Sequence, residues 1–139
     1  MKIVEYRTDE EFASIWPFIK MLNPTMKKRE FNVMLPEMLK DGFRVAAIVE
    51  NGNTLGISGF WIGYKFYSRK FLHIDAFCVA PEARSKGVGK KLLDWMEKLA
   101  AKEKCNMIVL NTYATNTASH KFYAREDYVI AGYHFLKKL

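Results

Sequence analysis

Hydrophobic and polar positions recur along the chain with two different periods, and the two periods predict a mixture of helices and strands. The clearest helix runs from residue 86 to about residue 104. In this stretch Val88, Leu92, Trp95 and Leu99 follow one another at intervals of four, three and four, which places them on one face of a helix. We therefore expect this helix to pack an apolar face against the rest of the protein.

Runs of mostly apolar residues predict the strands. The turn signal Asn51-Gly52 separates two of these runs and favours a hairpin between them. A further run, ending the chain at residues 128–139, predicts a terminal strand or half of a hairpin. The predicted strands cover residues 2–7, 43–50, 55–66, 71–79, 106–113 and 128–139.

Three more helices fill the remaining segments. Thr8 and Glu11 have the spacing of a capping box, and Pro17 is expected to kink or split the helix that they start. Further helical stretches are expected at residues 25–41 and 117–125. The order β-α-α-β-β-β-α-β-α-β predicts an α/β (α+β) fold, with one mixed, mostly antiparallel central sheet flanked by helices.

Composition supports one globular domain over residues 1–139, because 50% of the 139 residues are hydrophobic and 27% are charged. No stretch has the pattern of a signal peptide or a membrane span, so we expect an intracellular, cytoplasmic protein with no membrane partner. Cys78 and Cys105 lie at no metal-ligand spacing. We expect neither a disulfide nor a metal site.

The formal charge of +7 predicts an anionic partner, which includes nucleic acid, membrane surfaces and polyphosphates alike. One concentration of cations stands out at residues 84–90, R-S-K-G-V-G-K, directly before the long helix. A helix N-terminus favours an anion, and Gly87 and Gly89 let the backbone approach a ligand. This stretch therefore predicts a pyrophosphate site; the alternative is a tight turn with solvated lysines. It fits neither the Walker nor the Rossmann pattern.

The same stretch resembles the R/Q-x-x-G-x-G/A loop of the GCN5-related N-acetyltransferases (GNAT). As in that family, an apolar strand ending V-x-P-E precedes it, at Val79, Pro81 and Glu82. A second segment, N-x-x-S-x-x-F-Y from Asn116 to Tyr123, resembles the family's N-x-x-A-x-x-L/F-Y. Asp127-Tyr128 departs from the Gly-Phe that usually follows.

The resemblance implies the GNAT fold and an acetyl-CoA-dependent N-acetyltransferase, with acetyl-CoA or a close acyl-CoA as acyl donor. The loop amides would bind the pyrophosphate, the main chain at the end of strand 71–79 would pair with the pantetheine arm, and Asn116 would contact that arm. Lys90, Lys91, Lys121 or Arg125 could meet the 3′-phosphate. The implied cofactor-binding residues are Phe77, Cys78, Val79, Arg84, Ser85, Lys86, Gly87, Val88, Gly89, Lys90, Asn116, Ser119 and Tyr123.

For catalysis, Tyr123 matches the family's general acid, which would protonate the leaving thiolate. His73 and Asp75 lie two apart on one strand and therefore point to the same side of the sheet. Each falls near a position where some family members carry an acidic base, and other members use no dedicated base. The choice between His73 and Asp75 stays open.

The acceptor is expected to be a primary amine: a small amine, an amino acid, an antibiotic, or a protein N-terminus or lysine. Aromatic side chains that could line its site, or belong to the core instead, are Trp16, Phe31, Trp61, Tyr64 and Tyr67. The protein would act as a monomer or homodimer. Two other functions are possible: an inactive module that binds or senses acyl-CoA, and, with less support, a small basic nucleic-acid-binding domain, which would leave the loop glycines unexplained.

Overall fold

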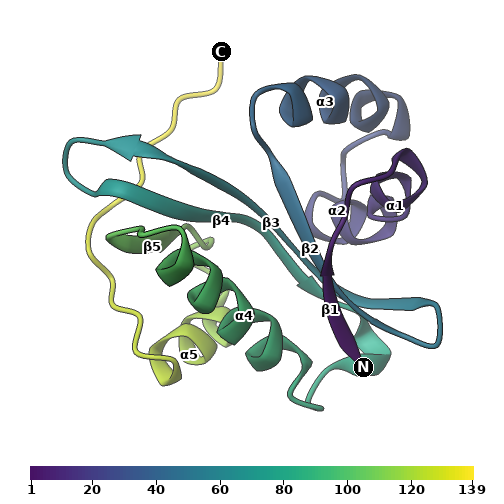
Figure 1. Ribbon diagram of the computed structural model, residues 1–139. Helices are drawn as coiled ribbons and strands as arrows, with labels where there is room; N and C mark the ends of the chain where they lie inside the picture. Colours follow the sequence, from purple (N-terminus) through teal and green to yellow (C-terminus); the bar gives the residue numbers. More distant parts are fainter. The chain divides into compact units, whose positions relative to one another are not determined.

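A computed structural model describes residues 1–139 (Figure 1). The contacts within the chain divide it into two compact units, residues 1–109 and 110–139. The helices and strands are β1 (Lys2–Glu5), α1 (Asp9–Ala13), α2 (Trp16–Leu22), α3 (Lys28–Lys40), β2 (Arg44–Glu50), β3 (Asn53–Lys65), β4 (Arg69–Val79), a 3₁₀ turn η1 (Pro81–Ala83), α4 (Val88–Lys102), β5 (Met107–Leu110) and α5 (Thr117–Arg125).

The five strands form one sheet in the order β1-β2-β3-β4-β5, and the first three neighbouring pairs are antiparallel. The predicted hairpin between β2 and β3 is confirmed. Asn51 and Gly52 both have positive φ, at 52° and 77°, as a two-residue turn between twisted strands requires. The mixed, mostly antiparallel sheet flanked by helices is the predicted fold class.

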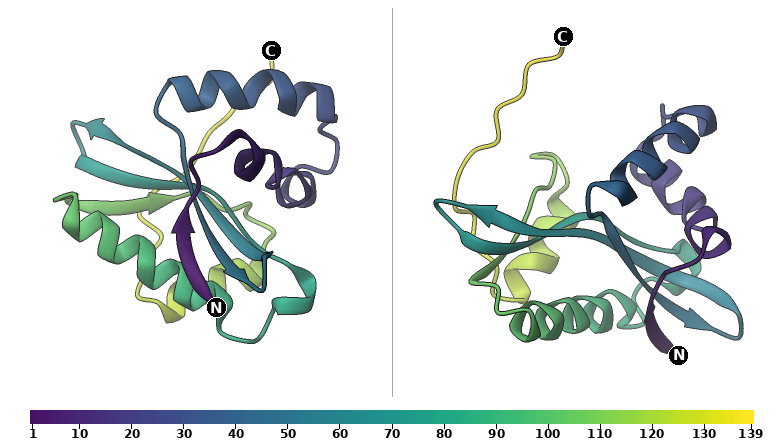
Figure 2. Two further views of the ribbon diagram at one scale, coloured as in Figure 1. Left: turned by 45° about the vertical axis from the view of Figure 1, so that its right-hand side comes forward. Right: turned by 45° about the horizontal axis from the view of Figure 1, so that its top comes forward.

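The first three helices cover one face of the sheet, and α4 lies on the other (Figure 2). The capping box is confirmed, since the Thr8 hydroxyl accepts a hydrogen bond from the Glu11 backbone N–H and the Glu11 carboxylate accepts one from the Thr8 backbone N–H. The predicted split at Pro17 is also confirmed: α1 ends at Ala13 and α2 begins one residue before the proline. The core beneath these helices includes Ile15, Phe18, Phe31, Phe43 and Ile57.

The long helix α4 packs on β2, β3 and β4. Its fully buried side chains are Val88, Leu92, Leu93 and Met96, whereas Trp95 and Leu99 are only partly buried. The buried face is therefore turned slightly from the one that the sequence spacing predicted. A sheet accepts a broader stripe of a helix than a single row of residues, which explains the difference.

The second unit contains one helix, α5, at the predicted residues. The terminal strand predicted at residues 128–139 is wrong, because this segment forms neither helix nor strand. Its alternating apolar residues are compatible with a strand, but a strand exists only where a neighbour completes its hydrogen bonds. Val129, Ile130, Tyr133 and Phe135 are all exposed. In both units, none of the helices has the length and apolar character of a membrane span.

Candidate functional site

The glycine-rich loop connects β4 to α4 through two residues in the left-handed region. After η1, Ser85 has φ 63° and Gly87 has φ 76°. The helix begins at Val88, and the Lys91 amide donates to the Gly87 carbonyl at 3.1 Å as its first turn closes. The amides before Lys91 belong to the start of the helix, where no carbonyl within the helix can accept from them.

The N-terminus of α4 is suited to binding an anion. No side chain caps the N-terminus at Gly87, and the helix places partial positive charge there. A Cβ built on Gly87 would meet no atom within 4 Å, so the glycine is required by its backbone conformation and not by crowding. The loop therefore combines exposed amides, open space and positive potential, which a pyrophosphate group would fit.

Three cationic side chains surround this loop in different ways. Arg84 folds back onto the sheet, where its Nε donates to the Val79 carbonyl at 3.2 Å. Lys90 lies 3.3 Å from Asp94, one turn along α4. Lys86 is exposed on the loop itself. Arg84 thus contributes to the fixed shape of the β4 end, and Lys86 adds charge at the loop surface.

The last residues of β4 alternate in the direction of their main-chain groups. The Ala80 amide donates to the Leu55 carbonyl on β3 at 2.8 Å. In an antiparallel pair this direction alternates, so Cys78 also faces β3 while Phe77 and Val79 face the opposite side. The Cys78 side chain is buried, and burial raises the pKa of its thiol. Of these three predicted contacts, only Phe77 and Val79 turn main-chain groups away from β3.

The neighbouring strand β5 does not extend along the last residues of β4. The Asn106 amide, just before β5, donates to the Lys70 carbonyl at 2.7 Å, and β5 ends only four residues later, whereas β4 continues to Val79. Counted residue by residue from this bond, β5 ends near the level of Ile74. The end of β4 is therefore long enough to pair with an extended ligand in the way that an added strand pairs with a sheet edge.

A β-bulge interrupts β4 at Asp75. Gly59 pairs with Ala76 and Phe60 pairs with Ile74, which leaves Asp75 without an opposite residue on β3. A bulge bends the strand and changes the direction of the side chain at that point. The Asp75 side chain is exposed, and its Oδ2 accepts a hydrogen bond from Trp61 Nε1 at 2.7 Å.

The two candidate bases lie on one face of the sheet. His73 is directly opposite Trp61 in the β3–β4 register, and residues opposite each other point to the same side. Because Trp61 also bonds Asp75, all three side chains are on this face, which is the face of Phe43. The His73 ring lies 6.5 Å from that of Phe71 in an edge-on arrangement.

The second unit places the N-x-x-S-x-x-F-Y residues along α5. Asn116 is the N-cap, and its Oδ1 accepts from the Ser119 amide at 3.2 Å; its amide group still carries two N–H donors. The Tyr123 ring lies 5.1 Å from Phe122 and 5.6 Å from Tyr128. Burial raises the pKa of the Tyr123 phenol to about 12, so this group is protonated at neutral pH.

The structure explains why Asp127-Tyr128 can replace the Gly-Phe pair of the sequence pattern. Asp127 has φ 67°, in the region that favours glycine, and aspartate is among the residues that tolerate it best. The Tyr128 amide donates to the Tyr123 carbonyl at 2.9 Å and closes the end of α5. The turn that usually contains Gly-Phe is thus formed here by Asp-Tyr.

The predicted aromatic residues divide between core and surface. Phe31 is buried and its ring contacts Trp16 at 5.2 Å, which assigns that pair to the core. Tyr64 and Tyr67 are exposed near the end of the β3–β4 hairpin. Trp61 differs from both groups, because it is partly buried and also bonds a candidate base.

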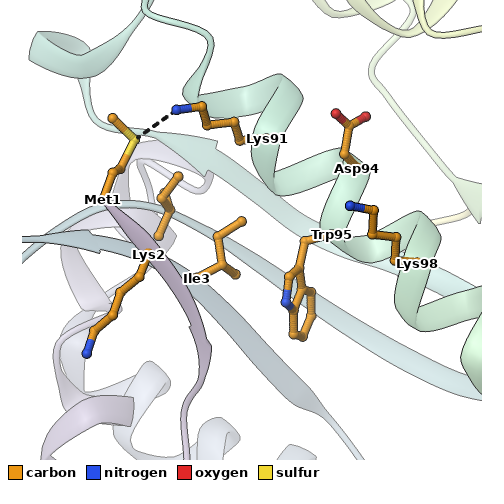
Figure 3. Close-up of a pocket in the computed structure, with 8 residues that line it drawn as sticks. Met1, Lys2, Ile3, Lys91, Asp94, Trp95 and Lys98 are labelled. Carbon is orange, nitrogen blue, oxygen red and sulfur yellow. Dashed lines mark hydrogen bonds between the residues drawn. The ribbon is translucent and has the colours of Figure 1, made fainter.

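Neither of two clefts is lined by loop residues 84–90 or by Asp75 at the bulge. The first, of about 360 Å³, is formed by β1, β2 and α4, with Lys91, Asp94, Trp95 and Lys98 on the helix side (Figure 3). The second, of about 390 Å³, lies between α1 and α3. No group of three or more His, Cys, Asp or Glu residues is arranged to hold a metal ion, and both cysteines are free thiols.

Sequence reasoning missed two features of these sites. Ser85 adopts a positive φ. The sequence did not predict this, because serine residues rarely have positive φ. The bond from Trp61 to Asp75 depends on the bulge, and strand alternation alone does not reveal it. The glycine at position 59 was the available signal, since glycine inside a strand often accompanies a bulge or a close approach.

Comparison with known proteins identifies the family. The sequence model of the Acetyltransferase (GNAT) family matches residues 7–128. No curated protein sequence matches the chain significantly.

Several solved structures have the same fold. The aminoglycoside N-acetyltransferase AAC(6')-Iy in complex with CoA has a TM-score of 0.86 at 17% identity, over 99% of this chain and 93% of that one. The same enzyme with a bisubstrate analogue of CoA and acetylneamine gives 0.84 at 16%, over 100% and 99%. A GNAT family acetyltransferase of Staphylococcus aureus gives 0.78 at 21%, over 100% of both chains.

The family match covers both the loop before α4 and the segment from Asn116 to Tyr123. The fold of the described chain is that of the acetyltransferase structures. The chain therefore belongs to the Acetyltransferase (GNAT) family and is an acetyltransferase.

Proposed function

We propose that this acetyltransferase binds acetyl-CoA at the loop before α4 and transfers the acetyl group to a primary amine by direct attack in a ternary complex. The observation that carries the proposal is the structure of the α4 N-terminus. No side chain caps this end of the helix, and Gly87, directly before it, adopts the left-handed conformation. The amides of residues 84–90 would donate to the pyrophosphate. Lys86 would add electrostatic attraction.

The pantetheine arm would extend along the end of β4. The main-chain groups of Phe77 and Val79 face away from β3, on the side where an extended amide chain would lie. The Val79 carbonyl already accepts from Arg84, but a carbonyl oxygen can accept a second bond. A main-chain N–H near Val79 would stabilise the oxyanion that forms on the thioester carbonyl.

The amine must lose a proton before it attacks. An alkyl ammonium group of pKa about 10.4 is neutral in roughly one molecule per thousand near pH 7.4, so a base assists the reaction. We assign this role to Asp75, acting directly or through one water, because its carboxylate is exposed and held by Trp61. His73 on the same face is the alternative.

The amine nitrogen then forms a bond to the carbonyl carbon, and the carbon–sulfur bond breaks as the tetrahedral species collapses. Tyr123 would give its phenolic proton to the departing sulfur, and the second proton that the nitrogen loses as the amide forms would return to the phenolate through solvent. The raised pKa of Tyr123 keeps the phenol protonated at neutral pH, so the proton is present when negative charge develops on the sulfur. Asn116 would contact the pantetheine arm through its side-chain amide, and Ser119 would lie beside it on α5.

We further propose that the two units form one catalytic domain over residues 1–139, which the family match across residues 7–128 supports. The free thiols of Cys78 and Cys105 are compatible with the reducing cytoplasm, where we expect the enzyme to act. The oligomeric form, monomer or homodimer, would follow from size-exclusion chromatography.

The test is a thiol-release assay with acetyl-CoA over a diverse amine library. Because similar structures include an aminoglycoside enzyme, the library should contain aminoglycosides, along with polyamines, amino acids and lysine-containing peptides. Release of CoA that depends on one class of amine would support the proposal and name the acceptor. Tight binding of acetyl-CoA without transfer to any amine would instead indicate a sensing module.

A further inference from the structure

We infer that Trp61 is a positioning residue that holds the Asp75 carboxylate in the orientation needed to accept a proton from the acceptor amine. The inference rests on the role proposed above for Asp75. It starts from the hydrogen bond that Trp61 Nε1–H on β3 donates to Asp75 Oδ2 on β4 at 2.7 Å. That distance is short for an N–H donor and typical of a charged acceptor.

The bulge explains why Asp75 needs a fixed partner. The β3–β4 register leaves Asp75 without an opposite residue, so no cross-strand neighbour restricts its side chain in the usual way. The side chain is also exposed, and an exposed aspartate moves among several rotamers. The bond to Trp61 selects one of them. It occupies Oδ2 and leaves Oδ1 directed elsewhere for a proton.

Trp61 is itself held by the sheet and by the hydrophobic core. Its ring lies 5.3 Å from that of Phe43 at an angle of 52°, and Phe43 is only 5% exposed. Gly59, two residues before Trp61 on the same face, makes room for Phe43, because a Cβ at Gly59 would collide with the Phe43 ring. The chain Gly59–Phe43–Trp61–Asp75 therefore links a rigid core to an exposed carboxylate.

Asp75 takes part in proton transfer in this proposal, whereas Trp61 does not. Asp75 Oδ1 takes one proton from the acceptor ammonium, directly or through one water, and the neutral amine attacks. Trp61 keeps its N–H throughout and exchanges no proton, so it acts only through the placement of Asp75. Small errors in the position of a base are costly, since the reacting groups must lie within hydrogen-bond reach.

The first test is a double-mutant cycle with Trp61→Phe and Asp75→Asn, using the amine that gives the highest turnover in the library. Phenylalanine keeps an aromatic ring beside Phe43 and removes the N–H donor, together with part of the apolar area of the indole. We expect Trp61→Phe to lower kcat about tenfold with little change in KM for acetyl-CoA. In the Asp75→Asn background the same change should alter kcat less than about twofold. Trp95→Phe, in the cleft between β1 and α4, is the matched control and should leave kcat unchanged.

The second test needs no activity. The chain has three tryptophans, so its ¹H–¹⁵N spectrum should show three indole N–H signals, and Trp61→Phe removes the one to be followed. Asp75→Asn should shift that signal and leave those of Trp16 and Trp95 in place. An unmoved Trp61 signal would overturn the inference whatever the enzyme does.

The kinetic outcomes separate this inference from the proposed function. If wild-type protein transfers acetyl groups but Trp61→Phe has wild-type kcat, the inference is wrong and the transferase stands. Equal losses from Trp61→Phe with and without Asp75 would also overturn it, since Trp61 would then act elsewhere. If no amine is acetylated, the proposed function fails, while the spectrum still tests the contact.

Discussion

The loop before α4 and the candidate catalytic residues differ in which atoms they use, since the loop presents main-chain groups and the catalytic residues present side chains. The loop offers main-chain amides, and its key residue, Gly87, has no side chain at all. Asp75, His73 and Tyr123 offer side chains whose direction depends on a bulge, a register and a helix. A main-chain site depends on backbone conformation, whereas a side-chain site depends on where neighbouring residues place it.

This difference predicts that changes in the two regions separate binding from chemistry. Substitutions in the loop should weaken the affinity for acetyl-CoA. Substitutions of the candidate catalytic side chains should lower kcat while that affinity is preserved, because they contribute to the transition state and little to the bound donor.

The largest effect is expected for Tyr123→Phe. Removal of the phenolic proton should lower kcat tenfold or more, since general acid catalysis contributes roughly 10²- to 10⁴-fold, while the affinity for acetyl-CoA stays within a few-fold. Steady-state kinetics and calorimetry measure the two effects. Tyr113→Phe, an exposed tyrosine in the same unit, is the control. Unchanged kcat with chemistry rate-limiting would remove Tyr123 from the mechanism.

Gly87→Ala tests the loop, and Gly52→Ala is its matched control. The two glycines have φ of 76° and 77°, and a Cβ at either would meet no atom within 4 Å. Alanine therefore costs each site a similar amount, about 1–2 kcal/mol of backbone strain. If the loop relaxes to relieve this strain, binding must restore it, and the affinity for acetyl-CoA should fall about tenfold.

Only Gly87→Ala should weaken acetyl-CoA binding, although both variants should lose stability in thermal unfolding. Equal affinities in the two variants would show that the left-handed conformation at Gly87 has no part in cofactor binding. Equal losses would show that the effect comes from general destabilisation.

A smaller effect is expected for Lys86→Gln. Lys86 is exposed on the loop and would attract the phosphates through solvent, where such interactions are worth roughly 1 kcal/mol or less. The affinity for acetyl-CoA should fall about two- to fivefold, and the difference should shrink at high salt. Lys40→Gln at the end of α3 removes the same charge far along the chain. A Lys40 variant with the same loss would point to net charge alone.

The smallest expected effect concerns alkaline pH. Burial raises the pKa of Tyr123 to about 12, above the usual value of about 10. The folded state therefore keeps a proton that the unfolded chain loses, and stability falls as pH rises from about 10 toward 12. Tyr123→Phe should show a weaker loss over this range in denaturant unfolding. In phenolate absorbance, one tyrosine of the wild type should titrate late and be missing from the variant.

The contrast between the two regions also explains what the sequence could predict. The loop was predictable because its conformation requires glycine at position 87 and a helix directly after it, and both are visible in the residues. The same holds for α5, whose bounds match the prediction. The split at Pro17 and the hairpin at Asn51-Gly52 follow from equally local rules.

The features that the sequence did not predict depend on partners distant in the chain. The bulge at Asp75 arises from pairing with β3, and the bond to Trp61 spans fourteen residues. The expected terminal strand failed for the same reason: residues 128–139 have a suitable pattern, but no neighbouring strand pairs with them. Local propensity cannot supply a partner.

The most direct test of phosphate binding by the loop compares S-acetyl-4′-phosphopantetheine with S-acetylpantetheine by calorimetric titration of the wild-type protein, because the two compounds differ only in the phosphate next to the pantetheine arm. Each hydrogen bond to a charged group contributes about 1.5–3 kcal/mol, so two or more loop amides should make the phosphorylated compound bind at least about 100-fold more tightly. Equal affinities, or no binding of acetyl-CoA to folded protein, would contradict the assignment of this loop.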